Sequence, residues 1–543
     1  MKSILTFLLI WLFATEHSST PSPTSFPNSG IVGRTDNALA RKDFERALLL
    51  LHNFEYPDAA ELFRAAQQKD PSFALAYWGE AMTYNHPVWL SQDAASAREV
   101  LKKYNQISGS QKEALPSLDK DLLASLDLLY GEGNKRERDK AYADFMATLY
   151  KKYKGHVDVA AFYSLSLLGA AGGWDEKLCH RAAEIAASIL KENPTHPGAL
   201  HYFIHAEDHP EFAKNAWNAA NDYAKVASYS GHALHMPSHI YLALGLWDDV
   251  VKSNEISWQA GIDRKDAKKL SNDALNYHGH WWLEYGYLQQ GRFSKAAEIL
   301  TNQLTYTRAL PSSTARTHFV IMKGHYLAET NDWANKLASE EVKVQDLRIE
   351  IRTLDRFLKA LSAYRNQDKV ALEKYTKEIE DDIAQSKQMA VINEGISQCK
   401  TKASSQAVPS QTGINQAIIL QEELKALLSF LNNDISGAKA HFNEAIKVEE
   451  QNGHFFGPPE ILKPTHEFFG EFLLAIGQPR EARPLFEKAL QKTPGRSQSL
   501  AGLMETCRLT GDINGQKSTD QRLKKNIQHG EVAKIPGFFT RPQ

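Results

Sequence analysis

Apolar residues recur at helical spacing along almost the whole chain. They lie three or four positions apart in segments of about 12 to 16 residues, and Gly, Asn, Asp or Pro separates one segment from the next. No segment keeps the two-residue alternation of apolar and polar positions that a half-buried strand requires. The pattern therefore predicts an all-α protein that is built from many short and medium-length helices.

A longer period is superimposed on this helical pattern. Ala59, Phe63, Ala66 and Pro71 form a series of small and large residues that ends in a helix-stopping proline. Similar series recur further along the chain, at Ala182, Ala186 and Pro194, at Ala216 and Ala220, at Ala438, Phe442 and Ala445, and at Ala482, Phe486, Ala489 and Pro494. In the central part the units repeat every 34 residues, apart from an insertion around residues 262–276. The spacing resembles the tetratricopeptide repeat.

The resemblance covers most of residues 40–525 and implies a fold. That fold is a right-handed α-solenoid of tetratricopeptide-like helix-turn-helix repeats, here with irregular insertions. A chain of 543 residues is too long for one compact core but suits an array in which each repeat packs on its neighbours. In the family, one helix of each pair lines a concave groove, which commonly takes up a peptide or protein segment.

The sequence divides into six parts. We interpret residues 1–20 as a signal peptide, 21–38 as a flexible linker, 39–393 as the N-terminal and central solenoid with a histidine-rich groove, 394–416 as a loop, 417–526 as C-terminal repeats, and 527–543 as a loosely held tail.

The first 20 residues indicate export. Lys2 precedes an eleven-residue apolar run at residues 4–14, which is too short to span a bilayer as a helix. We expect a periplasmic or secreted protein with no membrane insertion after the leader is removed; an uncleaved anchor is the alternative. The net charge of −2 argues against a nucleic-acid partner. With only three cysteines, the chain lacks a disulfide framework and a thiolate metal site.

Histidines gather in the central repeats. Nine of the twenty lie between residues 196 and 280. The repeat register, which we fixed from Ala, Gly, Tyr and Pro alone, places seven of these nine on groove positions of three successive units that begin at Pro197, Gly231 and Tyr277. The seven are His201, His205, His209, His232, His235, His239 and His278.

This clustering predicts a transition-metal site. His201 and His205 are four residues apart, so both rings lie on one helical face, and His235 and His239 repeat the spacing. We expect His201, His205, His232, His235, His239 and His278 as metal ligands, with Asp208 as a further ligand or as a group that orients an imidazole. Imidazole ligands without thiolates suit Zn, Cu, Fe or Ni. Interhelical hydrogen bonds or contacts with a peptide are the alternative.

Other groove positions carry candidate ligand-binding residues, namely Trp78, His86, His209, Trp281, Glu467 and Glu471. Two functions are therefore open. The first is a binding scaffold that takes up a peptide, protein or other ligand in the groove. The second is a metal-binding protein or a metalloenzyme, in which Glu207 or Asp208 would be the base for a metal-activated water. The sequence leaves catalysis open.

Overall fold

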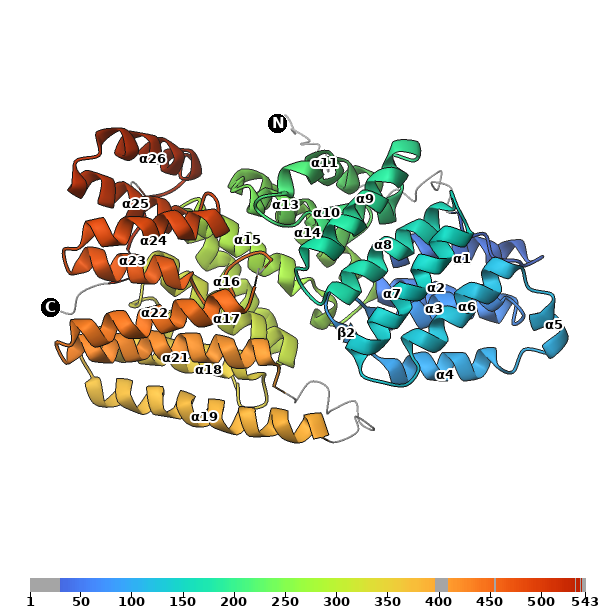
Figure 1. Ribbon diagram of the computed structural model, residues 1–543, viewed down its shortest axis with the longest axis horizontal. Coiled ribbons are helices and arrows are strands. Elements are labelled where there is room, and N and C mark those ends of the chain that lie inside the picture. The colour runs from blue at the N-terminus through green and yellow to red at the C-terminus, as the bar shows by residue number, and fades with distance from the viewer. Residues whose placement is uncertain (1–29, 396–408, 454–455, 533, 538, 540–543) are drawn as a thin grey trace, which may run out of the picture.

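The structure of the chain is a computed structural model that describes residues 30–395, 409–453, 456–532, 534–537 and 539. Within these residues the regular secondary structure is almost entirely helical, and successive helices pack against each other in antiparallel pairs (Figure 1). The tetratricopeptide-like α-solenoid expected from the sequence is confirmed. The predicted signal peptide and the first half of the predicted linker, residues 21–29, lie outside the described residues.

The N-terminal repeats form one end of the array. Their helices and strands are α1 (Ala38–His52), α2 (Tyr56–Lys69), α3 (Ala74–Met82), β1 (Asn85–His86), β2 (Ser91–Gln92), α4 (Ala94–Tyr104), α5 (Gly109–Glu113), α6 (Ser117–Leu129), α7 (Lys135–Lys152), α8 (Val157–Ala171) and α9 (Glu176–Glu192).

The central repeats follow. They comprise α10 (Pro197–Ala206), the 3₁₀ turn η1 (Ala213–Ala216), α11 (Trp217–Val226), α12 (Gly231–His235), α13 (Pro237–Ala243), α14 (Trp247–Lys268), η2 (Asn272–Ala274), α15 (Tyr277–Gln289), α16 (Phe293–Ala309), α17 (Ser313–Thr330), η3 (Lys336–Ser339), α18 (Ile349–Arg365) and α19 (Lys369–Gly395).

The C-terminal repeats complete the chain with α21 (Gln411–Leu431), α22 (Ile435–Gln451), α23 (Thr465–Ala475), α24 (Pro479–Lys492), α25 (Ser497–Thr510) and α26 (Ile513–Asn526). No helix in the described part of the chain combines the length and the apolar character needed to cross a bilayer.

Two large hydrophobic cores meet at α10. Ala199, Tyr202 and Ala206 belong to the core of the N-terminal repeats, whereas Leu200 and Ile204 belong to the core that continues through the central and C-terminal repeats. Because adjacent residues of a helix point to different sides, α10 joins both cores. The histidines of α10 therefore lie at the junction of the two cores.

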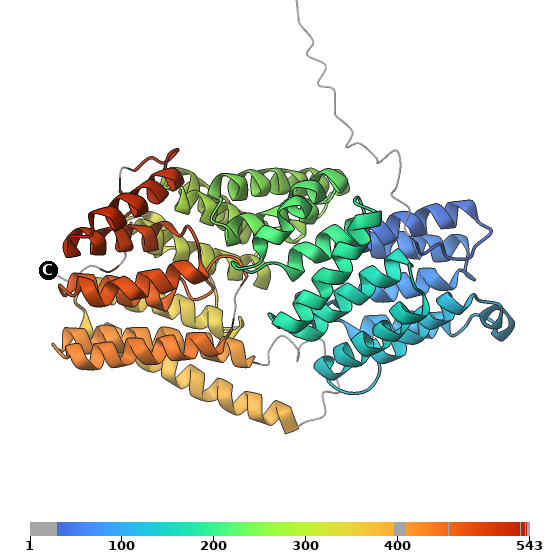
Figure 2. The same cartoon turned by 45° about the horizontal axis from the view of Figure 1, so that its top comes forward.

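The C-terminal repeats fold back onto the central ones (Figures 1 and 2). Trp247 at the start of α14 donates its indole N–H to the carbonyl of Gly495 at 2.8 Å, and Ser497 donates its hydroxyl to the carbonyl of Gln289 at 2.6 Å. Arg496, which lies between Gly495 and Ser497 in the sequence, is fully buried and contacts Glu467 and Tyr285. These contacts fix the end of α15 in place.

Three boundaries and one element differ from the expectations. Helices extend into both ends of the predicted 394–416 loop, since α19 ends at Gly395 and α21 begins at Gln411. The Ser410 side chain fixes the start of α21 by accepting from the Gly413 amide at 3.0 Å. In the predicted linker, Ile31 is buried and its amide donates to Asp158 at 2.7 Å. In the predicted tail, Ile535 is buried as well. The sequence pattern also missed the short antiparallel hairpin of β1 and β2.

The packing of the C-terminal repeats on the central ones requires a glycine at position 245. Gly245 has φ +70°, and a Cβ at this position would overlap the backbone carbonyl of Pro494. Gly511 also has positive φ (+76°), but a Cβ there would meet no atom within 4 Å. A comparison of substitutions at Gly245 and Gly511 therefore distinguishes the cost of the left-handed backbone from the cost of losing the close contact with Pro494.

We predict that Gly245→Ala lowers the stability more than Gly511→Ala does. Both variants force an L-residue into the left-handed region, at roughly 1–2 kcal/mol, but only Gly245→Ala also displaces the Pro494 backbone. Urea midpoints of the two variants and the parent protein measure the difference. Equal losses of stability in the two variants would contradict a role for the close contact between Gly245 and Pro494.

Candidate metal centre

Four helices, α10, α12, α13 and α15, present six of the clustered histidines, and three of them, α10, α12 and α15, begin at positions that the repeat register predicted. A polar side chain caps each of these three helices: His196 Nδ1 accepts from the Ala199 amide before α10, Ser230 Oγ from the Ala233 amide before α12, and Asn276 Oδ1 from the Gly279 amide before α15. Pro237 opens α13, but the chain stays helical through Met236 (φ −53°, ψ −37°). His235 and His239 therefore remain one turn apart.

We call His201, His205 and His232 the first triad. Each of these residues offers one ring nitrogen, and the three nitrogens lie within 4.8 Å of one another. His201 and His205 come from one face of α10, and His232 comes from α12 in the next repeat. The Nε2 atoms of His201 and His232 are 3.1 Å apart. Two nitrogens bound to one ion at 2.0–2.1 Å in tetrahedral geometry lie about 3.3 Å apart, so this spacing suits a shared ion.

His235, His239 and His278 form the second triad. Their ligating nitrogens also lie within 4.8 Å of one another. His235 ends α12, His239 lies in α13, and His278 lies in the first turn of α15. This triad therefore bridges two successive repeats, as the first one does. The structure thus brings together all six histidines that the sequence predicted as ligands.

Hydrogen bonds to Nδ1 orient three of the six rings. His201 donates Nδ1–H to the His52 carbonyl at 2.7 Å, His239 donates to the Asp208 carboxylate at 2.6 Å, and His235 donates to Asn254 Oδ1 at 2.6 Å. The Asn254 amide is oriented by its own Nδ2, which donates to the Val250 carbonyl. In each ring the proton is fixed on Nδ1, so Nε2 carries the lone pair that a metal would use. In His201 this nitrogen faces Nε2 of His232.

Burial keeps five of the six imidazoles neutral. His201 and His235 are fully buried, His239 is 7% exposed, and His205, His232 and His278 are half-buried. Loss of hydration lowers the pKa of His235 to about 3, and it lowers the pKa of His201, His205, His232 and His278 well below the usual value. Neutral imidazole is the form that binds a transition metal.

A third group, the buried His–Asp–His cluster of His52, Asp158 and His196, has a different character. Asp158 Oδ1 accepts from Nε2 of His52 at 3.2 Å and of His196 at 3.0 Å. Burial opposes ionisation of Asp158, but these two bonds outweigh it and hold the pKa of the carboxyl well below its usual range. His52 Nδ1 bonds to the Tyr202 hydroxyl, and His196 Nδ1 caps α10. Because both nitrogens of each ring are engaged, this cluster is a structural clamp.

Asp208 supports an imidazole, which is one of the two roles that the sequence left open. Its Oδ2 accepts from His239 Nδ1. The neighbouring Glu207 accepts from the Asn215 amide at 2.8 Å and takes no part in either triad. His209 also lies apart from the triads, because its ring stacks on Trp174 at a centroid distance of 4.6 Å.

Four of the six predicted groove residues are buried, which corrects their assignment to an open surface. Trp78 is fully buried in the N-terminal core, and Trp281 donates its indole N–H to His325. Glu467 pairs with Arg496, and Glu471 pairs with Lys463. In a regular array these four positions line an open groove. In this chain the hydrophobic core and the C-terminal part of the chain cover them. His86 stacks on Tyr56 at 4.2 Å.

Aromatic rings that the sequence pattern did not indicate enclose the two triads. Phe54 lies 4.2 Å from the His201 ring, Trp282 lies 4.4 Å from the His239 ring, and Trp89 lies 5.6 Å from the His232 ring, all between centroids. Trp89 comes from the hairpin of β1 and β2 and is 48% exposed. Phe54 and Trp89 are distant from the triads in sequence, so no local pattern indicated them.

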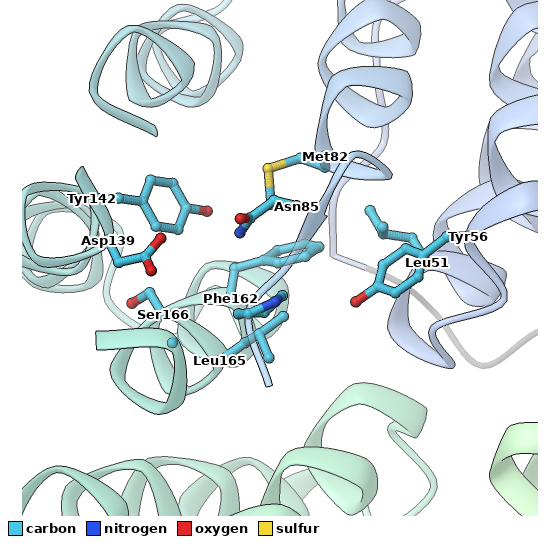
Figure 3. A pocket seen from close by; sticks show the side chains of 11 residues that line it. Leu51, Tyr56, Met82, Asn85, Asp139, Tyr142, Phe162, Leu165 and Ser166 are labelled. Carbon is cyan, nitrogen blue, oxygen red and sulfur yellow. The ribbon is translucent and has the colours of Figure 1, made fainter. Parts of the chain in front are cut away.

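The N-terminal core contains a cavity that Tyr56 lines on one side (Figure 3). Met82, Phe162 and Leu165 supply apolar walls, and Asp139 enters from α7. Lys135 forms an ion pair with Asp139. The lining contains none of the triad histidines, so the cavity is separate from the candidate centre.

Comparisons with known proteins add little to this picture. No family model matches the sequence, and no curated protein matches it. Among solved structures, the human IFIT1 dimer with PPP-AAAA is 12% identical, with 91% of this chain and 96% of that chain covered and a TM-score of 0.35. Yeast Tom70 is also 12% identical, with coverages of 90% and 91% and a TM-score of 0.31. At such scores the likeness supports no inference about ligands.

We predict that acid weakens the fold through His325. Trp281 donates to its Nδ1, and its Nε2–H donates to the Pro459 carbonyl at 2.8 Å, so the folded site has no place for a second proton. Burial lowers the pKa of His325 to about 3, whereas the unfolded value is about 6.5. Between these values only the unfolded chain takes up the proton. The free energy of unfolding therefore falls by about 1.4 kcal/mol per pH unit for this residue as the pH decreases.

The measurement is urea unfolding of metal-free protein at pH 7 and pH 5. His325→Gln keeps an acceptor and a donor but does not titrate, so its stability should depend less steeply on pH, by roughly one proton. The same pH dependence in both proteins would contradict the assignment.

Proposed function

We propose that this protein binds two late first-row transition-metal ions, copper or zinc, one in each histidine triad. The observation that carries the proposal is the combination of convergent nitrogens with fixed outer hydrogen bonds. Nitrogens of each triad lie within 4.8 Å of one another, and the rings of His201, His235 and His239 each donate Nδ1–H to an acceptor. Among the described residues, Nε2 of His205 and Nε2 of His235 are buried without a hydrogen-bond partner. His52 and His196, by contrast, use both ring nitrogens in hydrogen bonds.

The ligand set favours copper or zinc over iron. All six candidate ligands are imidazoles, and the nearby carboxylate of Asp208 is engaged by His239. Non-haem iron sites combine histidines with a carboxylate ligand, whereas copper and zinc bind readily to imidazole alone. Zinc takes three histidines and one open position in catalytic sites, a geometry that each triad can supply.

Protein binding is the second candidate function. Stacked helix pairs form extended surfaces that many repeat proteins use to hold partners. Trp89 and Leu90 at the tip of the hairpin are each 48% exposed, and Trp89 contacts His232 of the first triad. An exposed aromatic and aliphatic pair of this kind is a natural contact point for a partner. A binding role of this kind is compatible with bound metal.

We predict two metal ions per chain. Protein prepared without a histidine tag is dialysed against Cu(II) or Zn(II), freed of loose ions and analysed for metal. Each triad supplies three nitrogens, so the parent protein should hold two ions. His205→Ala combined with His239→Ala removes one ligand from each triad and should abolish tight binding.

His280→Ala is the matched control. His280 lies on α15 beside His278, but its ring stacks on Trp258 at 3.8 Å, outside both triads. This variant should keep both ions, and circular dichroism should show that all variants remain helical. A folded parent protein that retains no metal would sink the proposal.

We predict that Asp208→Asn weakens the second triad selectively. The carboxylate that accepts from His239 raises the basicity of the imidazole, and the loss of such a partner costs roughly 10–100-fold in metal affinity. Glu207→Gln is the matched control, because Glu207 is adjacent in sequence and bonds to Asn215. Competition with a chelator measures both sites. Equal effects of the two substitutions would contradict the role of Asp208.

A further inference from the structure

The two triads are in contact with each other. The rings of His205 and His239, one from each triad, have centroids 5.6 Å apart, and the rings of His232 and His235 have centroids 6.3 Å apart. Distances within the first triad run from 4.9 Å for His201 and His205 to 6.4 Å for His205 and His232. Spacing between the triads is therefore the same as spacing within one.

Each triad supplies three ligands and leaves a coordination position open. The acidic side chains beside the triads are already engaged: Asp208 by His239, Glu207 by Asn215, and Glu55 by the Ser230 hydroxyl and the His232 amide. None of these three carboxylates is placed to complete a metal site. The open position of each ion must therefore be filled from solvent.

The surroundings of the six rings favour an anion in that position. Phe54 and Trp282 cover the triads with apolar surface, and the six imidazoles are neutral ligands. Two dications side by side in such a site repel each other strongly, since the low local dielectric does not screen their charges. One small anion that contacts both ions relieves the repulsion. A metal-bound water readily provides it, because coordination lowers the pKa of water to about 7 and the proton leaves to solvent.

We propose that the two triads form a single dinuclear centre, in which the two metal ions share one small bridging anion such as hydroxide. The proposal rests on the metal binding proposed above and deepens it. Adjoining ions in two-metal sites lie about 3.5–4 Å apart, a distance that one bridging oxygen atom spans. The ligand class is a small anion that replaces the hydroxide, for which azide is a suitable probe.

Copper(II) tests this arrangement whichever metal the protein binds naturally, because each Cu(II) ion carries one unpaired electron. A single-atom bridge couples the two spins. Protein with two Cu(II) ions should therefore lose most of the electron paramagnetic resonance intensity expected for two independent spins. Azide should bind with a stoichiometry of one per pair of copper ions. Metal analysis of the same samples gives the number of ions.

Two variants sharpen the result. His278→Ala removes a ligand of the second triad and should leave one copper ion with its full resonance intensity, whereas His280→Ala should behave like the parent protein. Two bound copper ions with full two-spin intensity, or two azides per pair, would overturn the dinuclear centre and leave the proposed metal binding intact. Parent protein that binds fewer than two ions by metal analysis fails the proposed stoichiometry, and the dinuclear centre fails with it.

Discussion

Imidazoles can lie side by side in a protein interior only where their protonation is suppressed. Each ring that is removed from water resists protonation, and its neighbours add to that resistance, as the lowered pKa values of His201 and His232 reflect. Neutral rings with fixed Nδ1 protons are preorganised ligands. The outer partners that fix these protons are therefore as much a part of the centre as the histidines: the His52 carbonyl, Asn254 and Asp208.

The same residue types serve another purpose a short distance away. Asp158 holds the rings of His52 and His196 and also accepts from the Ile31 amide, so it ties the segment before α1 to α8 and α10. This clamp sets the position of the His52 carbonyl and, through it, the ring of His201. Each triad differs from this structural cluster in one ring, because Nε2 of His205 and Nε2 of His235 have no hydrogen-bond partner among the described residues, although all three groups have ligand-like spacing.

The packing of the C-terminal repeats on α15 supports the second triad. Arg496 is fully buried and pairs with Glu467 and Glu329, and it contacts Tyr285 on α15. Removal of one member of such a network leaves a buried charge without a partner, which is strongly destabilising. α15 also carries His278 and Trp282, so packing of the C-terminal repeats on this helix holds one ligand and one apolar wall of the centre in place.

The sequence by itself determined the repeat and its phase. Helical periodicity and the small residues at fixed offsets located the starts of α10, α12 and α15, and four-residue spacing placed His201 with His205 and His235 with His239 on shared faces, because these relations are local. Only the tertiary structure decided which rings converge, that Asp208 supports His239 from outside, and that Trp78 and Glu467 are buried rather than open to a groove. Those outcomes depend on contacts between residues that are far apart in sequence, such as the contact of Phe54 with His201 and of Gly245 with Pro494, and no periodicity encodes them.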